Sequence, residues 1–283
     1  MIRRAYPRLV LYGLASGALL LSFVAPAAAQ LHGLDQDIQL CNRLEDVTEP
    51  RIAACTAVIE SGAATPRGLA IAYNNRGNAY NARGDIKKAI DDYNEAITAD
   101  PRYARAFSNR GVAHLKTNEQ KRALEDFDQS IRLDPNSAPV FVNRAEALQR
   151  AGDFRRALQD YSTAIRIQPD LDAAWNGRCW VRAIVGELRP ALTDCNEALR
   201  IKANAPATLD SRALAYLKLG QVDEAIADYN AALQAQPKLA TSLYGRGLSK
   251  RRKGNTTEAN ADIAAAVAIA PNIASDFAKY GVK

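Results

Sequence analysis

The sequence predicts an all-α solenoid of antiparallel helix pairs, and three observations lead to that prediction. An arginine recurs at intervals of 34 residues, at Arg76, Arg110, Arg144, Arg178, Arg212 and Arg246. An aspartate follows each arginine after 16 residues, at Asp92, Asp126, Asp160, Asp194, Asp228 and Asp262. Small, aromatic and helix-ending residues keep the same period. One helix pair of this size cannot bury its apolar face alone, so several must stack into a continuous core.

Each unit is expected to hold two helices with defined ends. In the first unit, Gly84 lies where the first helix must end, and Pro101 ends the second. Glycine recurs at the first of these positions as Gly152, Gly186, Gly220 and Gly254. The six units are expected at residues 70–103, 104–137, 138–171, 172–205, 206–239 and 240–273.

The residues at fixed positions of the unit resemble the tetratricopeptide repeat family. With Ala70 as position 1, the family pattern at positions 4, 8, 11, 20, 24, 27 and 32 falls on Tyr73, Gly77, Tyr80, Ala89, Tyr93, Ala96 and Pro101. The fourth unit deviates, because its proline is displaced to Pro206. The resemblance covers Ala70 to about Ile273. It implies a right-handed superhelix with a concave face lined by the first helices at positions 2, 5, 6, 9, 12 and 13.

The N-terminal segment has the pattern of a secretory signal peptide. Arginines precede an apolar run from Leu9 to Val24, and small residues end at Ala29. A retained membrane anchor is the alternative, but the apolar run is shorter than the roughly 20 residues that span a bilayer. We therefore expect cleavage after Ala29, a periplasmic or secreted protein, and no stable membrane insertion. Without the leader, 34 basic residues face 31 acidic ones, which gives no footprint for nucleic acid.

Residues 30–69 are expected to form a degenerate leading hairpin and a linker. Its helices are expected near Asp37 to Leu44 and Arg51 to Ile59, with a break at Thr48 to Pro50 and the linker at Ser61 to Gly68. Residues 273–283 are expected to form a C-terminal capping helix, with Phe277 and Tyr280 covering the last hairpin.

The four cysteines favour disulfide bonds in an exported chain. Cys41 and Cys55 straddle the turn of the leading hairpin. Cys179 and Cys195 occupy positions 8 and 24 of the fourth unit, which face each other across a helical hairpin. The expected pairs are therefore Cys41 with Cys55 and Cys179 with Cys195. The alternative is small buried thiols in the core.

The arginine and aspartate series allows two interpretations. Arginine can bind a carboxylate or phosphate ligand, but an arginine present in every unit with its own aspartate is better explained as a repeating structural ion pair. We expect the second.

Ligand binding is expected on the concave face, and its two halves differ in composition. Position 6 is Asn75, Asn109 and Asn143 in the first three units, with Asn74 and Asn78 beside them. Their amides can hold the backbone of an extended peptide, which resembles the asparagine ladder of the O-GlcNAc transferase superhelix. In units four to six, position 9 is apolar, with Trp180, Leu214 and Leu248. These side chains form either an interaction site or packing between adjacent first helices.

No catalytic constellation is apparent, so no enzyme and no cofactor are expected. The two histidines, His32 and His114, are too few for a histidine-based metal site or triad, and His114 is expected in the core. The favoured function is a scaffold, adaptor or chaperone-like protein that binds a protein or an extended peptide in the groove. The alternatives are a glycan-binding accessory factor of envelope polysaccharide or peptidoglycan machinery and a self-assembling structural protein, so an oligomer is also possible.

Overall fold

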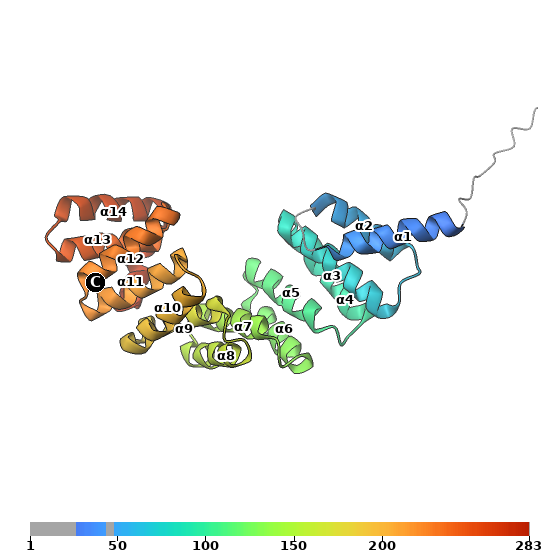
Figure 1. Cartoon of the computed structure of the whole chain (residues 1–283), viewed down its shortest axis with the longest axis horizontal. Helices are drawn as coiled ribbons and strands as arrows, with labels where there is room; N and C mark the ends of the chain where they lie inside the picture. Colours follow the sequence, from blue (N-terminus) through green and yellow to red (C-terminus); the bar gives the residue numbers. More distant parts are fainter. Residues whose placement is uncertain (1–26, 44–47, 283) are drawn as a thin grey trace, which may run out of the picture.

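The computed structural model describes residues 27–43 and 48–282, and within them the chain forms fifteen α-helices and no strands (Figure 1). The predicted all-α solenoid of antiparallel helix pairs is confirmed. The expected signal peptide lies outside the described residues, apart from its last three residues, which begin the first helix. Within the described ranges no single helix is long and apolar enough to cross a membrane, although the bent pair of the last two helices meets the length and composition criteria together.

The helices follow one another in pairs. The leading hairpin is α1 (Ala27–Asn42) and α2 (Thr48–Glu60). The first helices of the six repeats are α3 (Pro66–Arg83), α5 (Ala104–Lys116), α7 (Ala138–Arg150), α9 (Asp172–Val185), α11 (Pro206–Leu219) and α13 (Ala240–Arg252). The second helices are α4 (Ile86–Ala99), α6 (Gln120–Leu133), α8 (Phe154–Ile167), α10 (Leu188–Ile201), α12 (Val222–Ala235) and α14 (Thr256–Ile269). A short helix, α15 (Ile273–Lys279), ends the chain.

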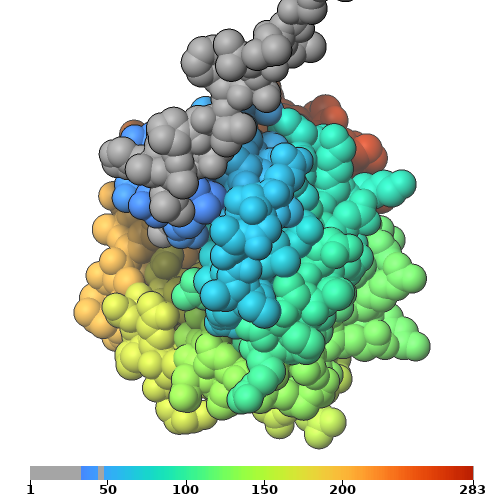
Figure 2. All heavy atoms as spheres, turned by 90° about the vertical axis from the view of Figure 1, so that its right-hand side faces the viewer, coloured from blue at the N-terminus to red at the C-terminus, as the bar shows by residue number. Residues whose placement is uncertain are grey.

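The packing of the helices identifies the inner face of the solenoid. Each first helix contacts the first helix of the next unit, whereas no second helix of the described repeats contacts another second helix. The first helices therefore line the concave face. Seen from the N-terminal end, the colours run clockwise from cyan through green and yellow to orange as the chain recedes (Figure 2), which is the path of a right-handed superhelix.

The arginine and aspartate series is confirmed as a structural ion pair. In all six repeats the arginine Nε and Nη2 donate to the two carboxylate oxygens of its aspartate, at 2.6 to 2.9 Å. The third nitrogen reaches the preceding second helix, as when Arg144 Nη1 donates to Asp128 at 2.7 Å. Each arginine therefore ties three helices together by charge-assisted hydrogen bonds. The six aspartates are at most 7% exposed.

Local backbone geometry explains where the helices end. Gly84, Gly152, Gly186, Gly220 and Gly254 all have positive φ, between 78° and 93°. In the second repeat Asn118 takes the same role with φ 62°, because asparagine tolerates the left-handed region better than most residues. The displaced Pro206 does not end a second helix. It begins α11, where proline fits the first turn.

Two boundaries of the leading region differ from the sequence-based expectation. Residues Thr48 to Pro50, expected as a break, form the first turn of α2, where a proline lacks no hydrogen bond. The last part of the expected linker is also helical. The helix α3 begins at Pro66, and the Thr65 side chain accepts a hydrogen bond from the backbone of Gly68 as its N-cap.

The cysteine pairs lie as expected. Cys41 and Cys55 are joined within the leading hairpin, with sulfur atoms 2.08 Å apart. Cys179 and Cys195 join α9 to α10, with sulfur atoms 2.03 Å apart. All four side chains are buried. One disulfide therefore lies in each half of the array.

The C-terminal helix turns into the groove. Its axis bends by 103° from that of α14, and Phe277 packs on Tyr244 of α13 with ring centroids 4.8 Å apart. The ring of Tyr280 lies 5.2 Å from that of Trp180, which belongs to α9. The segment therefore packs on the last hairpin and also reaches a first helix two repeats earlier.

Candidate functional site

Two hollows lie along the first helices of the described repeats. The first hollow, of about 650 Å³, lies in the N-terminal half, and we call it the arginine cavity because Arg67, Arg102 and Arg105 line it. The second, of about 450 Å³, lies farther along and is lined chiefly by α7, α9 and α11. We call it the acidic pocket after Glu146 and Asp210. Nearly all its lining residues occupy positions 2, 5, 6, 9, 12 and 13 of their units, the positions that the family resemblance assigned to the groove.

The arginine cavity combines charge with amides. Arg67 is paired with Asp100 at 2.6 Å and stacks over the ring of Tyr103 at 4.2 Å. The hydrogen bond from Arg67 is the largest cause that lowers the pKa of the Asp100 carboxyl. The Asn75 amide lines the cavity and donates to Asn42 Oδ1 at 3.0 Å. The cavity can therefore offer guanidinium donors and amide groups to one ligand.

The asparagines of the N-terminal half hydrogen-bond to one another. Asn109 Nδ2 donates to Asn74 Oδ1 at 2.8 Å, which joins position 6 of one unit to position 5 of the preceding unit. Ser211 repeats this link in the C-terminal half by donating to Asn176 at 2.9 Å. Asn74 is only 2% exposed, so its role is to hold Asn109 rather than to meet a ligand.

The remaining predicted asparagines are half-buried. Asn78 accepts a hydrogen bond from the Tyr93 hydroxyl at 2.8 Å, which fixes it to the seam of its own hairpin. Asn143 is half-buried on α7, at the middle of the array. At position 6 of the first three units, Asn75, Asn109 and Asn143 are therefore partly exposed on successive first helices.

In two of the three later units, the absence of asparagine at position 6 has a steric reason. At position 6 of the fourth unit, a Cβ on Gly177 would lie 2.3 Å from the ring of Tyr161. At position 6 of the sixth unit, a Cβ on Gly245 would lie 2.3 Å from Tyr229. These tyrosines of the preceding second helices take the space that asparagine side chains use in the first half. No residue with a side chain fits there unless the ring moves.

The acidic pocket is built around Asp210, which sequence reasoning missed. Its side chain is 7% exposed and accepts a hydrogen bond of 2.5 Å from Ser242. Burial raises the pKa of Asp210 to about 6, against the opposing effect of the Ser242 and Thr241 hydroxyls. Glu146 lies on α7 one turn before Arg150, and desolvation raises the pKa of its carboxyl while Arg150 opposes the rise. A departure from the repeat pattern, an acid at position 5, was the available signal.

The predicted apolar residues of the second half are not equally accessible. Leu214 is 1% exposed and Leu248 is 7% exposed, and both belong to the core cluster that includes Phe277 of α15. Trp180 is half-buried, with its ring against Tyr280 while it also lines the acidic pocket. Lys218 Nζ fastens the segment by donating to the carbonyl oxygen of Tyr280 at 2.7 Å. Trp180 is therefore the member of this set that faces the groove.

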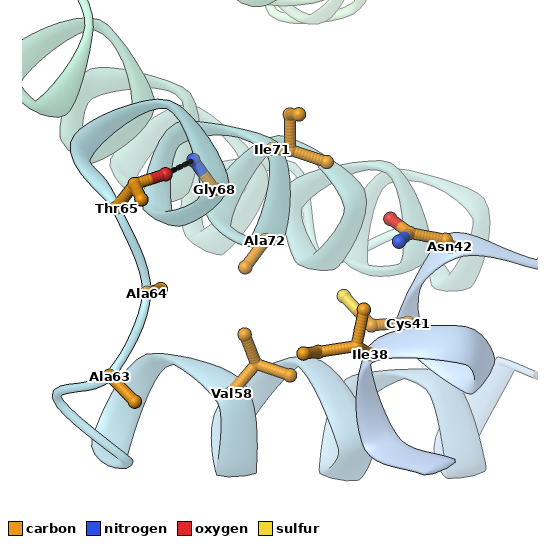
Figure 3. A pocket seen from close by; sticks show the side chains of 10 residues that line it. All are labelled: Ile38, Cys41, Asn42, Val58, Ala63, Ala64, Thr65, Gly68, Ile71 and Ala72. Carbon is orange, nitrogen blue, oxygen red and sulfur yellow. Dashed lines mark hydrogen bonds between the residues drawn. The ribbon is translucent and has the colours of Figure 1, made fainter. Parts of the chain in front are cut away.

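A third hollow, of about 290 Å³, lies between the leading hairpin and α3. Figure 3 shows that Ile38, Val58 and Ala72 point into it, with the Asn42 amide at one side. Asn42 and Ile71 also line the arginine cavity. The two hollows therefore adjoin, and an apolar side chain fits beside the polar cavity.

Within the described ranges, no group of three or more His, Cys, Asp or Glu side chains is arranged so that it could hold a metal ion. His114, expected in the core, is 6% exposed. Its Nε2 lies 3.8 Å from Asp126 of the ion-pair series.

Comparison with known proteins identifies the repeat. One family model, described as TPR repeat, matches residues 77–118 and 213–254, and two models described as tetratricopeptide repeat match residues 104–137 and 142–206. No curated protein matches the chain significantly in sequence.

Several solved structures share the fold at low sequence identity. One is a tetratricopeptide repeat protein from Parabacteroides merdae, with TM-score 0.66 and 16% identity over 90% of this chain and 98% of that one. PilW, a type IV pilus biogenesis factor, has TM-score 0.65 and 18% identity over 74% and 98%. YrrB, described as having an unusual peptide-binding site, has TM-score 0.54 and 19% identity over 69% and 98%. With the family matches along the array, these likenesses lead to one conclusion: the chain belongs to the tetratricopeptide repeat family.

Proposed function

We propose that this chain is an exported, non-catalytic scaffold that binds an extended segment of another protein in its concave groove. The observation that carries the proposal is the line of half-buried amides on successive first helices, Asn75, Asn109 and Asn143, with hollows on both sides of it. A side-chain amide offers both hydrogen-bond donors and an acceptor. It can therefore bind the backbone of an extended segment whatever the sequence of that segment.

The succession of hollows along the groove favours an extended protein segment over a small molecule as the ligand. The hollows follow one another along the first helices, the apolar hollow adjoins the arginine cavity, and the acidic pocket lies beyond α5. An extended chain advances about 3.3 Å per residue, so a segment can cross several first helices. The peptide-binding site described for YrrB shows that a protein of this fold can bind a peptide.

Export is supported by the sequence and by the cysteines. The leader pattern ends at Ala29, and both cysteine pairs lie at disulfide distance in buried positions. Such bonds persist in oxidising compartments such as the periplasm. The mature chain from Gln30 is therefore the form to test.

The test is capture of peptides from a random-sequence library by the mature protein. The variant N109A/N143A removes two groove amides, and Gln159→Ala is its matched control because Gln159 is an exposed amide on the second helix α8. We expect peptides to be retained by the wild type and by Q159A, and to be lost from N109A/N143A with its unfolding transition preserved. Equal retention by all three proteins would reject binding through these amides.

A further inference from the structure

Asp210 is unlike every other buried acid of the described chain. The buried carboxylates are the six aspartates of the ion-pair series and Asp210. Each of the six is paired with an arginine, whereas within the described residues Asp210 has no basic group at salt-bridge distance, and its recorded partner is the neutral hydroxyl of Ser242. A buried anion without a cation is costly, so its presence requires an explanation other than stability.

The surroundings of Asp210 contain further oxygens without partners. Tyr229 is fully buried behind the residues that line the pocket, and its hydroxyl makes no hydrogen bond in the described structure; burial raises the pKa of this phenol, and the Asp210 charge adds to the rise. Thr241 lines the pocket, and its Oγ1 likewise makes no well-formed hydrogen bond there. Buried polar atoms in native proteins are usually hydrogen-bonded to protein groups or to water, so each unpaired atom requires an explanation. The Asp210 carboxylate and the Thr241 hydroxyl therefore offer the pocket acceptor oxygens that the described chain does not fully use.

The rest of the lining favours the same kind of ligand. Glu146 and Arg150 lie one helical turn apart on α7 and offset each other, so the formal charge of the pocket is negative through Asp210. Trp180 and Tyr161 supply aromatic surface, and aromatic faces attract cations. The volume of about 450 Å³ lies within the range of ligand pockets.

We propose that the acidic pocket is the subsite for a positively charged side chain, ammonium or guanidinium, of the protein segment that lies in the groove. The assignment rests on the proposed function. The donors of the cation would meet the Asp210 carboxylate and the Thr241 hydroxyl, while its aliphatic stem would lie against Trp180. The pocket thus selects lysine or arginine at one place in a segment that the amides hold without reading its sequence.

The first experiment uses the side chain alone. Nα-acetyl-lysine N-methylamide and the corresponding arginine compound are titrated into the mature protein, with the uncharged norleucine compound as control, and the indole N–H resonance of Trp180 is followed by NMR. We expect a saturable shift with the two cations and little with norleucine. Asp210→Asn, which keeps the shape of the side chain, should weaken binding on the order of tenfold or more, whereas Q159A should bind as the wild type does.

The outcomes separate this inference from the proposed function. Equal shifts with the norleucine compound, no saturable shift with either cation, or unchanged binding by a folded D210N protein would each overturn the inference. The peptide library supplies the second readout, in which wild-type protein should enrich lysine and arginine and D210N should not. Peptides retained without that enrichment would reject the cation subsite and leave the groove function standing. A library that yields no peptides, together with cation binding in the titration, would reject the groove function and keep the chemistry of the pocket.

Discussion

In the N-terminal half of the groove, asparagine amides line the concave face, whereas in the C-terminal half two tyrosine rings and a buried carboxylate take their place. The difference arises at position 6, which is Asn75, Asn109 and Asn143 in one half and glycine or serine in the other. The rings of Tyr161 and Tyr229 pack against Gly177 and Gly245 of the next first helix, where a side chain would otherwise lie. One repeat thus yields two surfaces, because a second helix can place its aromatic residue over a neighbouring glycine.

The halves also differ in what covers them. The helix α15 and Tyr280 pack on Trp180 and Tyr244 in the C-terminal half. In the N-terminal half the apolar hollow and the arginine cavity are lined by the leading hairpin and the first two units. The C-terminal residues therefore stabilise one half at the cost of part of its apolar surface.

The largest loss of stability is expected when one of the buried ion pairs is broken, and the loss should differ between the two halves. Asp194 is 1% exposed and accepts hydrogen bonds from both Arg178 and Arg182, whereas Asp92 is bound by Arg76. Breaking a buried pair leaves an uncompensated charge, which costs about 3–5 kcal/mol. Asp194→Ala should therefore lower the free energy of unfolding more than Asp92→Ala. Equal urea-unfolding midpoints for the two variants would contradict the difference.

The disulfides give the next largest effect, and here the halves should be alike. The pairs are separated by 14 and 16 residues, so closing each loop should stabilise the fold by about 3 kcal/mol. Replacing both members of one pair by alanine isolates each bond, and unfolding by denaturant under non-reducing conditions measures the loss. A large loss for one pair and none for the other would show that loop closure does not set its contribution.

Exchange of the residues at position 6 tests the steric explanation. Gly177→Asn places a side chain where Tyr161 lies, and overpacking of this kind costs about 1–3 kcal/mol. The reciprocal change Asn143→Gly should cost only about 0.5–1 kcal/mol through backbone entropy. The free energies of unfolding of the two variants provide the comparison. A G177N protein as stable as the wild type would show that the tyrosine moves freely.

The smallest effect is a dependence on pH that belongs to the C-terminal half. Burial raises the pKa of Asp210 from 3.8 to about 6. Between these values the folded chain holds a proton that the unfolded chain has released, so stability from this group is present at low pH and is lost as the pH rises through about 6. Asp210→Asn should remove this dependence. The advantage of D210N over the wild type should therefore grow by about 2 kcal/mol between pH ~4 and pH ~7.5 in urea unfolding. If the difference in unfolding free energy between D210N and the wild type did not change with pH, the Asp210 carboxyl would be exposed to water and its pKa would not be raised.

The sequence predicted the features that repeat and missed those that do not. Period, ion pairs and helix ends could be derived because each recurs in register, and the cysteine pairs followed from their places across two turns. The burial of Leu214 and Leu248 could not be derived in full, because their core cluster includes Phe277 of α15, and no local pattern encodes the 103° bend before that helix. Asp210 escaped notice because acids are common on solvated helix faces, and only three-dimensional packing shows that this one is buried without a cation.

The most direct test of the account is the response of the groove amides to a captured peptide. Side-chain amide resonances of Asn75, Asn109 and Asn143 are followed by NMR as the peptide is added, with Gln159 as the reference amide on a second helix. The account predicts that the three asparagine resonances shift together and saturably while Gln159 stays unchanged. Shifts confined to second helices, with the three asparagines unaffected, would contradict binding in the concave groove.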